Sequence, residues 1–353
     1  MTVSSALPKI PDRGGPAQPL LTVRGLTKSF GLRMPFGKYS QSFKAVRDIS
    51  FEVGKGTTLG IVGESGCGKS TCARLIAGIT ASDSGEVLLD GQEFWTPGAT
   101  IGREMRRALQ MVFQDSSSSL NPKMTIGDTI AFGAKVHGMP RREAEVLAQE
   151  LLSKVGLAPH EYLHRLPHQL SGGQRQRVNI ARAIAVGPRL LILDEPVSAL
   201  DKAVEAQVLD LLLGLKKEAD LTYIFISHDL NVIRFIADEV AVMYLGEIVE
   251  MGPVADVFSR PSHPYTQALL ASRLSLDPAD RPTSAPLRGE PPALGEKMAG
   301  CPFRTRCDRS ADVCAERAPM LESVSTMMPR HQVSCWIAND GAARRGQVGG
   351  KGV

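Results

Sequence analysis

Short apolar runs alternate with stretches of helical periodicity along roughly the first 250 residues of the chain. The runs that predict buried strands are residues 20–23, 58–62, 190–193 and 223–226, and an alternating pattern predicts another strand at 45–53. Apolar residues at helical spacing predict a helix over residues 71–79.

Most of residues 115–185 also follow a helical pattern, with one helix opening at Thr125 and another over residues 142–155. Residues 31–44 are rich in Gly, Lys and Ser and predict a long surface loop between the first two strands. Apolar strands that alternate with helices favour an α/β fold, in which a mainly parallel sheet is covered on both faces.

The composition changes after about residue 251, where prolines become frequent and indicate a separate appendage. No internal repeat is visible, so we expect a single copy of the α/β domain. Both ends of the chain have the composition of flexible segments. The expected organisation is a disordered tail at 1–19, an α/β domain at 20–250 with a helical subdomain at about 115–185, a C-terminal extension at 251–340 and a disordered tail at 341–353.

Charge and composition exclude several classes of protein. The net charge is only +4 over 353 residues and no long Lys/Arg block occurs, so nothing favours nucleic-acid binding. No run approaches about 18 consecutive apolar residues, so we expect no membrane-spanning helix. The first residues lack the layout of a secretion signal. The six cysteines are therefore expected to be reduced thiols or metal ligands rather than disulfides.

Residues 63–70 match the phosphate-binding loop pattern G-x-x-x-x-G-K-[ST]. A predicted strand precedes this segment and a predicted helix follows it, which argues against a chance glycine-rich turn. Lys69 is expected to pair with the β- and γ-phosphates, and the Ser70 hydroxyl to bind Mg²⁺. The nucleotide-binding residues expected here are Gly63, Glu64, Ser65, Gly66, Cys67, Gly68, Lys69, Ser70 and Thr71.

Two adjacent carboxylates end the apolar run at residues 190–193. Asp194 is expected to hold Mg²⁺, often through water, as the strand-end aspartate of phosphate-loop ATPases does. Glu195 is then free to polarise the attacking water as the general base. In isolation Glu195 could equally form a structural salt bridge, but a carboxylate beside a phosphate loop favours the catalytic role.

A second phosphate-binding element is predicted at residues 171–174. A small hydroxyl residue and two glycines precede a periodic apolar stretch, which places backbone N–H groups and the Ser171 hydroxyl at a helix N-terminus. The residues expected to contact nucleotide there are Ser171, Gly172, Gly173 and Gln174. Because one phosphate loop already exists elsewhere in the chain, this half-site suggests that each ATP is held between two protomers.

The segment Leu170–Gln174 resembles the signature motif of ATP-binding cassette (ABC) ATPases, and the family's other motifs occur in the expected order. Gln114 resembles the glutamine that touches Mg²⁺ and the attacking water. Residues 198–201 are similar to the loop that crosses the dimer interface, which adds Asp201 to the nucleotide site. His228 resembles the switch histidine at the γ-phosphate. The resemblance implies a P-loop NTPase core, ATP and Mg²⁺, and head-to-tail closure of two cassettes on two ATP molecules.

Phe30 follows the opening strand, where the adenine-stacking aromatic of ABC ATPases usually lies. Stacking on adenine and a core position near a strand end are equally compatible with the sequence.

Four cysteines occur in the C-terminal extension: Cys301, Cys307, Cys314 and Cys335. Four thiols in a segment with little predicted core suit a metal site. Their gaps are wider than the usual zinc spacing, which favours a [4Fe–4S] cluster over tetrathiolate Zn²⁺. Four reduced cysteines in a small fold remain an alternative, since spacing alone does not identify a metal.

Residues 263–270, 300–303 and 331–335 resemble the ending of ATPase subunits of oligopeptide/dipeptide importers. This implies a peripheral protein at the cytoplasmic face of the inner membrane. Its implied partners are a second ABC ATPase subunit, either a paralogue or another copy of this chain, two transmembrane permease subunits and, through the complex, an extracytoplasmic solute-binding protein. Importers of nickel, opines, glutathione and some oligosaccharides share the ending and stay as alternatives. A soluble ABC ATPase of translation or DNA repair is disfavoured, because such proteins usually carry two cassettes or a long insertion.

Overall fold

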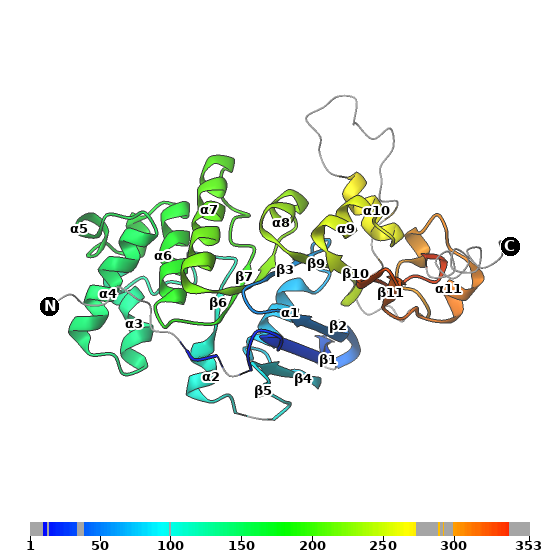
Figure 1. Cartoon of the computed structure of the whole chain (residues 1–353), viewed down its shortest axis with the longest axis horizontal. Coiled ribbons are helices and arrows are strands. Elements are labelled where there is room, and N and C mark those ends of the chain that lie inside the picture. Colours follow the sequence, from blue (N-terminus) through cyan, green and yellow to red (C-terminus); the bar gives the residue numbers. More distant parts are fainter. Residues whose placement is uncertain are drawn as a thin grey trace.

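The computed structural model describes residues 10–338 except 13, 34–38, 99, 273–288, 290–291 and 293–298. The predicted tail at 341–353 and the first nine residues of the predicted tail at 1–19 lie outside the described residues. Asp12 forms ion pairs with Lys55 at 2.5 Å and with Arg189 at 3.1 Å, so this part of the N-terminal segment contacts the core. Figure 1 shows an elongated molecule with a helical region at one end, the sheets in the middle and the C-terminal extension at the other end.

An eight-stranded mixed sheet forms the centre, in the order β11-β12-β10-β9-β3-β8-β7-β6. Five neighbouring strands are parallel: β6 (Leu109–Val112), β7 (Leu190–Asp194), β8 (Thr222–Ile226), β3 (Thr58–Val62) and β9 (Glu239–Tyr244). The antiparallel strands are β10 (Glu247–Pro253), β12 (Met328–Val333) and β11 (Glu322–Ser325). All residues of β3, β7 and β8 are buried, which confirms the predicted mainly parallel core.

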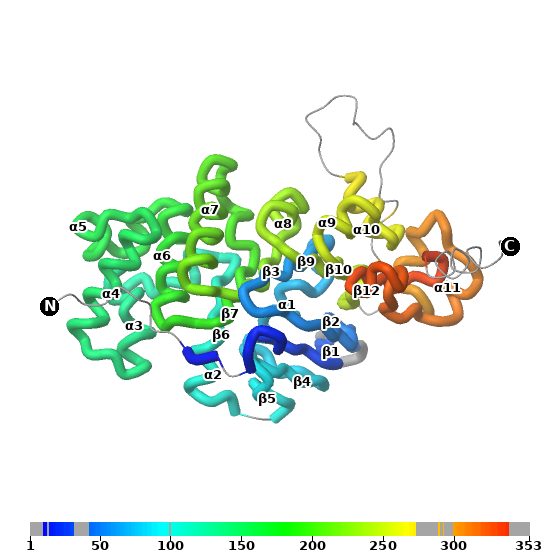
Figure 2. The backbone as a smooth tube through the Cα atoms, viewed as in Figure 1, coloured from blue at the N-terminus to red at the C-terminus, as the bar shows by residue number. Residues whose placement is uncertain are grey.

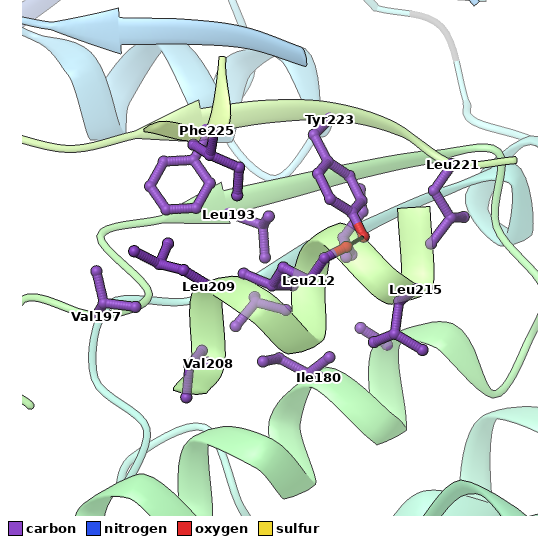
Figure 3. Packing of buried hydrophobic residues seen from close by; sticks show 14 of the residues in the cluster. Ile180, Leu193, Val197, Val208, Leu209, Leu212, Leu215, Leu221, Tyr223 and Phe225 are labelled. Atoms are coloured by element: carbon purple, nitrogen blue, oxygen red, sulfur yellow. Dashed lines mark hydrogen bonds between the residues drawn. The ribbon is translucent and has the colours of Figure 1, made fainter. Parts of the chain in front are cut away.

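The side chains of β7 and β8 alternate between two apolar clusters, one on each face of the sheet. The first cluster contains Leu191, Leu193, Tyr223 and Phe225, and the second contains Leu190, Ile192, Ile224 and Ile226. Helix α7 (Lys202–Ala219) covers the first face through its buried leucines, and the Tyr223 hydroxyl donates a hydrogen bond to the Leu212 carbonyl at 3.0 Å (Figure 3). Burial on both faces explains why these strands are continuously apolar.

A second sheet is antiparallel throughout, in the order β2-β1-β4-β5. Its strands are β1 (Leu21–Arg33), β2 (Tyr39–Val53), β4 (Ser84–Leu89) and β5 (Gln92–Trp95). The predicted surface loop at 31–44 is wrong, because residues 31–33 extend β1 and residues 39–44 belong to β2. Phe30 and Gly31 are exposed here, so this end of the ribbon has no buried face to impose an apolar alternation.

Residues 126–184 are mainly helical, whereas residues 115–125 of the predicted helical stretch form turns. It consists of α3 (Ile126–Val136), α4 (Arg141–Lys154), α5 (Pro159–Tyr162), the 3₁₀ turn η1 (Pro167–Gln169) and α6 (Gly172–Ile184). The Thr125 hydroxyl accepts the Asp128 N–H at 3.1 Å and caps α3, as a threonine before an apolar periodic run does. The other helices of the cassette region are α1 (Lys69–Ile76), α2 (Arg103–Ala108) and α8 (Leu230–Ile236).

The C-terminal extension continues the central sheet rather than starting a new one. Strand β10 runs across residue 250, where the boundary was expected, and pairs with β12 through Glu250 opposite Val333. The extension also holds α9 (Val254–Ser259), α10 (Pro264–Ala271), the 3₁₀ turn η3 (Arg304–Arg306) and α11 (Asp312–Glu316). Figure 2 shows this segment, yellow to red, at the end of the molecule opposite α3–α5. Among the described helices, none has the length and apolar character needed to cross a membrane.

Candidate functional site

The phosphate-loop segment joins β3 to α1 in a conformation that requires glycine. Gly63, Gly66 and Gly68 have φ of 156°, 78° and 109°. A Cβ on Gly63 would lie 2.2 Å from the Met243 carbonyl oxygen, and one on Gly68 would lie 2.3 Å from the Ala45 carbonyl oxygen. The loop is therefore packed against backbone from two other strands, and neither glycine can be replaced without moving it.

Lys69 begins α1, and its side chain turns back over the loop. It is 5% exposed, and its Nζ donates to the carbonyl oxygens of Gly63 at 2.8 Å and Glu64 at 3.0 Å. A buried ammonium with two carbonyl partners is held inside the loop that would surround a phosphate.

Ser70 and Asp194 bring a hydroxyl and a carboxylate together. The Ser70 Oγ donates to Asp194 Oδ1 at 2.8 Å, and Asp194 is 1% exposed. Burial raises the pKa of Asp194, with the Ser70 hydrogen bond opposing this effect. Two hard oxygen donors side by side, one of them a buried carboxylate, fit the ligand chemistry of Mg²⁺.

Glu195 lies at the centre of a second hydrogen-bonded group. The Gln114 amide donates to Glu195 Oε2 at 3.0 Å, and His228 Nδ1 lies 3.4 Å from the same oxygen. Glu195 has a φ of 47°, a left-handed conformation that costs a non-glycine residue about 1–3 kcal/mol. Its N–H donates to the Ile226 carbonyl at 3.0 Å, which fixes this conformation at the end of β7.

These residues meet because they follow neighbouring parallel strands. Gly63 follows β3, Gln114 lies just beyond β6, Asp194 ends β7, and His228 lies just beyond β8. Since β3, β8, β7 and β6 are consecutive in the sheet, their carboxyl ends form one edge, which is where ligands bind in open α/β sheets. The structure thus brings together the loop and both acidic residues with Gln114 and His228.

The predicted signature segment lies elsewhere, at the start of α6 in the helical region (Figure 1). Ser171 is exposed; its hydroxyl accepts the Gln174 N–H at 3.3 Å, and Gln174 Oε1 accepts the Ser171 N–H at 2.9 Å. This capping box shapes the first turn of the helix. A Cβ on Gly173 would lie 2.6 Å from Val204, so α6 approaches α7 closely there, and Gly172 is also partly exposed.

The remaining predicted nucleotide residues have varied surroundings. Asp201 is exposed and caps α7, since its carboxylate accepts the N–H groups of Ala203 at 3.1 Å and Val204 at 2.9 Å. Phe30 lies on β1, 37% exposed, with its ring 6.0 Å from that of Phe43. Lys28 Nζ also lies over this ring, 5.6 Å from its centre.

Within the loop, Ser65 and Gly66 are exposed, whereas Cys67 is 5% exposed; Thr71, on α1, is partly buried.

The four C-terminal cysteines gather in the small fold formed by residues 299–338. Cys301, Cys314 and Cys335 are buried and Cys307 is partly buried, all as free thiols. Burial raises the pKa of Cys301 to about 11, and the other three thiols add to the shift. Within the residues that the structure describes, no three Cys, His, Asp or Glu side chains converge as a metal site, so the thiols as placed do not fit a cluster or Zn²⁺.

Two residues at this site were not predicted. The Tyr265 hydroxyl accepts the Glu64 N–H at 2.9 Å, and Arg306 forms an ion pair with the Glu64 carboxylate at 2.8 Å. Tyr265 belongs to a sequence segment whose resemblance to importer ATPases was noted, but no local pattern indicates that either residue reaches the phosphate loop.

The loop, the buried Ser70–Asp194 pair and the edge of the parallel sheet define a phosphate-loop nucleotide-binding protein. A family model described as ABC transporter matches residues 46–198, and one described as the C-terminal region of oligopeptide/dipeptide transporters matches residues 249–314. The chain belongs to the ABC transporter family, and it is an ATPase subunit of that family.

Relatives and solved structures agree with this assignment. The oligopeptide transport ATP-binding protein OppF of Haemophilus influenzae is 43% identical, covering 90% of this chain and 96% of the relative. The corresponding protein AppF of Bacillus subtilis is 42% identical, covering 90% of this chain and 97% of the relative. The dimeric ATP-binding cassette MJ0796 with ADP and Pi is 27% identical with a TM-score of 0.58, covering 66% of this chain and 98% of that structure. CbiO1 of Clostridium perfringens, part of the transporter complex CbiONQ, is 28% identical with a TM-score of 0.57, covering 69% of this chain and 91% of that structure.

Proposed function

We propose that this chain is the ATP-hydrolysing subunit of a membrane importer for oligopeptides or dipeptides. The observation that carries the ATPase chemistry is that two groups of contacting side chains, Ser70–Asp194 and Gln114–Glu195–His228, lie along one edge of the parallel sheet. The peptide substrate is supported by the match of residues 249–314 and by the names of relatives similar over nine-tenths of the chain.

In this proposal the backbone N–H groups of residues 63–71 and the Lys69 ammonium hold the ATP phosphates. Ser70, Asp194 and Gln114 supply the oxygen ligands of Mg²⁺, which when bound neutralises phosphate charge. Phe30 offers its exposed face to adenine. Binding of ATP requires Lys69 to release the carbonyls of Gly63 and Glu64, so the loop exchanges internal contacts for contacts with phosphate.

Glu195 is proposed to accept the proton of the attacking water. Gln114 and His228 both contact Oε2 of this carboxylate, so they orient it while Oε1 stays available for water. His228 is 58% exposed and can reach outward to a γ-phosphate.

Ser171, Gly172, Gly173, Gln174 and Asp201 are proposed to act on an ATP bound by another subunit. Ser171 and Asp201 are exposed, and Ser171 caps α6 in the helical region rather than lying at the sheet edge. Two cassettes closing head-to-tail would bring each signature segment to the other's phosphate loop. The partners are a second ABC ATPase subunit and two permease subunits, with a solute-binding protein engaged through the complex. In this proposal the chain acts at the cytoplasmic face of the inner membrane.

Replacement of the proposed base tests the mechanism. Glu195→Gln should lower ATP turnover at least about 100-fold, because proton abstraction contributes about 10²–10⁴-fold. ATP binding should persist, and size-exclusion chromatography with ATP should show a trapped dimer. Glu145→Gln, which breaks only an exposed ion pair with Arg141 on α4, is the matched control and should behave as wild type. Normal hydrolysis by Glu195→Gln would exclude Glu195 as the base.

The transported solute is tested in the complex with its permease subunits. Peptides should stimulate ATP turnover in the reconstituted complex, whereas nickel, opines, glutathione and oligosaccharides should not. Stimulation by one of those solutes alone would replace the peptide assignment and leave the ATPase mechanism in place.

We also propose that the four C-terminal cysteines form a metal site, with [4Fe–4S] favoured over Zn²⁺. Its support is the sequence spacing and the gathering of four free thiols in one small fold; ligation would require them to draw closer than they lie here. Anaerobically purified protein should contain about four iron atoms per chain and absorb in the visible region, and Cys314→Ser should remove both signals. Protein with neither iron nor zinc would show that the thiols are simply reduced.

A further inference from the structure

Glu64 is the second residue of the phosphate loop, and the C-terminal extension contacts both its backbone and its side chain. The Tyr265 hydroxyl accepts its N–H at 2.9 Å, and Arg306 pairs with its carboxylate. On the other side, the Glu64 carbonyl accepts a hydrogen bond from Lys69 at 3.0 Å. The shape of the loop thus depends on residues that lie 201 and 242 positions further along the chain.

The Arg306–Glu64 contact has the geometry of a strong ion pair. Arg306 Nη1 donates to Glu64 Oε2 at 2.8 Å and Nη2 donates to Oε1 at 3.1 Å, so both carboxylate oxygens are engaged. The arginine side chain is 4% exposed and that of Glu64 is 25% exposed. A planar guanidinium suits this two-point contact, whereas a lysine ammonium would supply only a point charge.

An aromatic cluster fixes the two contacting residues in place. The ring of Tyr265 lies 4.7 Å from that of Tyr244, at the end of β9, and 5.5 Å from that of Phe303. Arg306 lies over the Tyr244 ring, 5.9 Å from its centre. Because Tyr244 and Tyr265 are fully buried, these contacts form part of the core of the extension. The hydroxyl and the guanidinium therefore have little freedom to leave Glu64.

The charge of Glu64 explains why such a contact is needed. A loop that surrounds a triphosphate carries an acidic side chain, and an unpaired carboxylate there would repel the ligand. Arg306 offsets this charge and holds it on the side facing the extension. Tyr265 meanwhile holds the backbone at the start of the loop, next to Gly63.

We propose that Arg306 and Tyr265 are positioning residues for ATP binding: the extension neutralises Glu64 and holds the phosphate loop in the form that accepts ATP. This inference rests on the proposed role of residues 63–71 in binding phosphate. It assigns the extension a direct part in nucleotide binding in addition to any role in assembly.

The test uses the purified full-length chain, the Kd for a fluorescent ATP analogue, and KM and kcat for ATP hydrolysis. Arg306→Gln should raise Kd and KM about tenfold or more, with kcat changed less than about threefold, since the base and metal ligands are untouched. Arg306→Lys should recover part of the loss, because it restores the charge without the two-point contact. The double variant Glu64→Gln/Arg306→Gln should recover most of the ATP affinity lost in Arg306→Gln, because the repelling charge is removed too.

Arg330→Gln is the matched control. Arg330 also comes from the extension and pairs with a carboxylate of the cassette, Glu239, but the Arg330 side chain is 72% exposed and the ion pair involves no loop residue. Its Kd for ATP should equal that of wild type.

Wild-type Kd and KM in Arg306→Gln, or a double variant as impaired as that single variant, would overturn the proposal. If Arg306→Gln does not fold, as judged by circular dichroism, Tyr265→Phe decides. It removes only the hydroxyl and keeps the aromatic cluster, so an unchanged Kd would refute the role of Tyr265 and a several-fold rise would support the proposal. Failure of wild type to bind ATP any better than Lys69→Ala would instead refute the proposed function itself.

Discussion

Lys69 satisfies its ammonium with carbonyls of its own loop, at 2.8 and 3.0 Å. This arrangement keeps a buried charge hydrogen-bonded without ligand, which avoids the cost of an unpaired ammonium. It also means that a bound phosphate must replace the two carbonyls as partners of Lys69. The affinity for ATP therefore depends on the difference in free energy between the lysine paired with carbonyls and the lysine paired with phosphate. The loop is thus prepared for its ligand without being left strained or open.

The thiol of Cys67, two residues before this lysine, allows the proposed phosphate loop to be tested by chemical labelling. Its thiol is 5% exposed and burial raises its pKa, so a maleimide at pH 7 should label it slowly in the folded protein and rapidly after unfolding. Protein modified at Cys67 should lose ATP binding, because the added group would occupy the loop. Peptide mapping by mass spectrometry follows the reaction; Cys72, fully buried with its pKa raised to about 12, serves as the internal reference. Full ATPase activity in chains shown to carry the label would contradict this expectation.

The sequence predicts the position of those site residues that belong to a local motif. Lys69 and Asp194 each follow an apolar strand, so their order along the chain implied a common edge of the sheet. The roles assigned to Lys69 and Asp194 stay predictions, as do those of Phe30 and Asp201, whose exposure alone decides neither. Arg306 could not be predicted, because its contact with Glu64 depends on how a distant segment packs, and no periodicity or motif encodes that.

Helix α10 is anchored where the cassette meets the extension, by a group of buried polar residues. His263 caps the helix, with Nδ1 accepting the Tyr265 N–H at 3.0 Å. Glu250 on β10 accepts the N–H groups of Ser262 at 2.7 Å and His263 at 2.9 Å, and contacts His331 Nε2 at 2.7 Å. Three elements therefore depend on one buried carboxylate, and loss of such a group leaves several donors unpaired.

His263 predicts a dependence of stability on pH. Burial lowers its pKa to about 3, well below the usual value near 6.5, so the unfolded chain binds the extra proton between these values. The stabilisation is fully present above about pH 6.5 and is lost as the pH falls toward 3, by up to about 1.4 kcal/mol per pH unit. His263→Asn keeps an acceptor for the helix cap without titrating, and should flatten the dependence measured by urea unfolding from pH 7 to 4. The exposed His160→Asn should keep the wild-type slope, and an equal slope in both variants would rule out His263 as the cause.

Elements with a strong apolar pattern were predicted well, and those without one were not. Strands β3, β7 and β8 are buried on both faces and read as continuous apolar runs, whereas β4 and β5 are short and half exposed. The ribbon of β1 and β2 was mistaken for a loop at residues 31–44, because its exposed end lacks an apolar face. Strand β12 contains an arginine and a histidine and has no apolar pattern that predicts a strand. It is a strand because it pairs with β10.

At the scale of the whole molecule, most of the proposed nucleotide residues form two groups on different regions. One group lies along the edge of the parallel sheet, and the other lies at the start of α6 in the helical region (Figure 1). A chain with this division is expected to show ATP turnover that rises more than linearly with protein concentration, since each complete site needs two cassettes.

The pairing of β10 with β12 also limits how subunits of this kind can be cut and recombined. A fragment ending near residue 250 would expose the edge of β10 and leave the Glu250 carboxylate without His331 or the N–H groups that it accepts. The cassette and its extension are therefore expected to fold as one unit. A chimera that exchanges the extension between two such ATPases must carry β10, and the partners of Glu64, along with it.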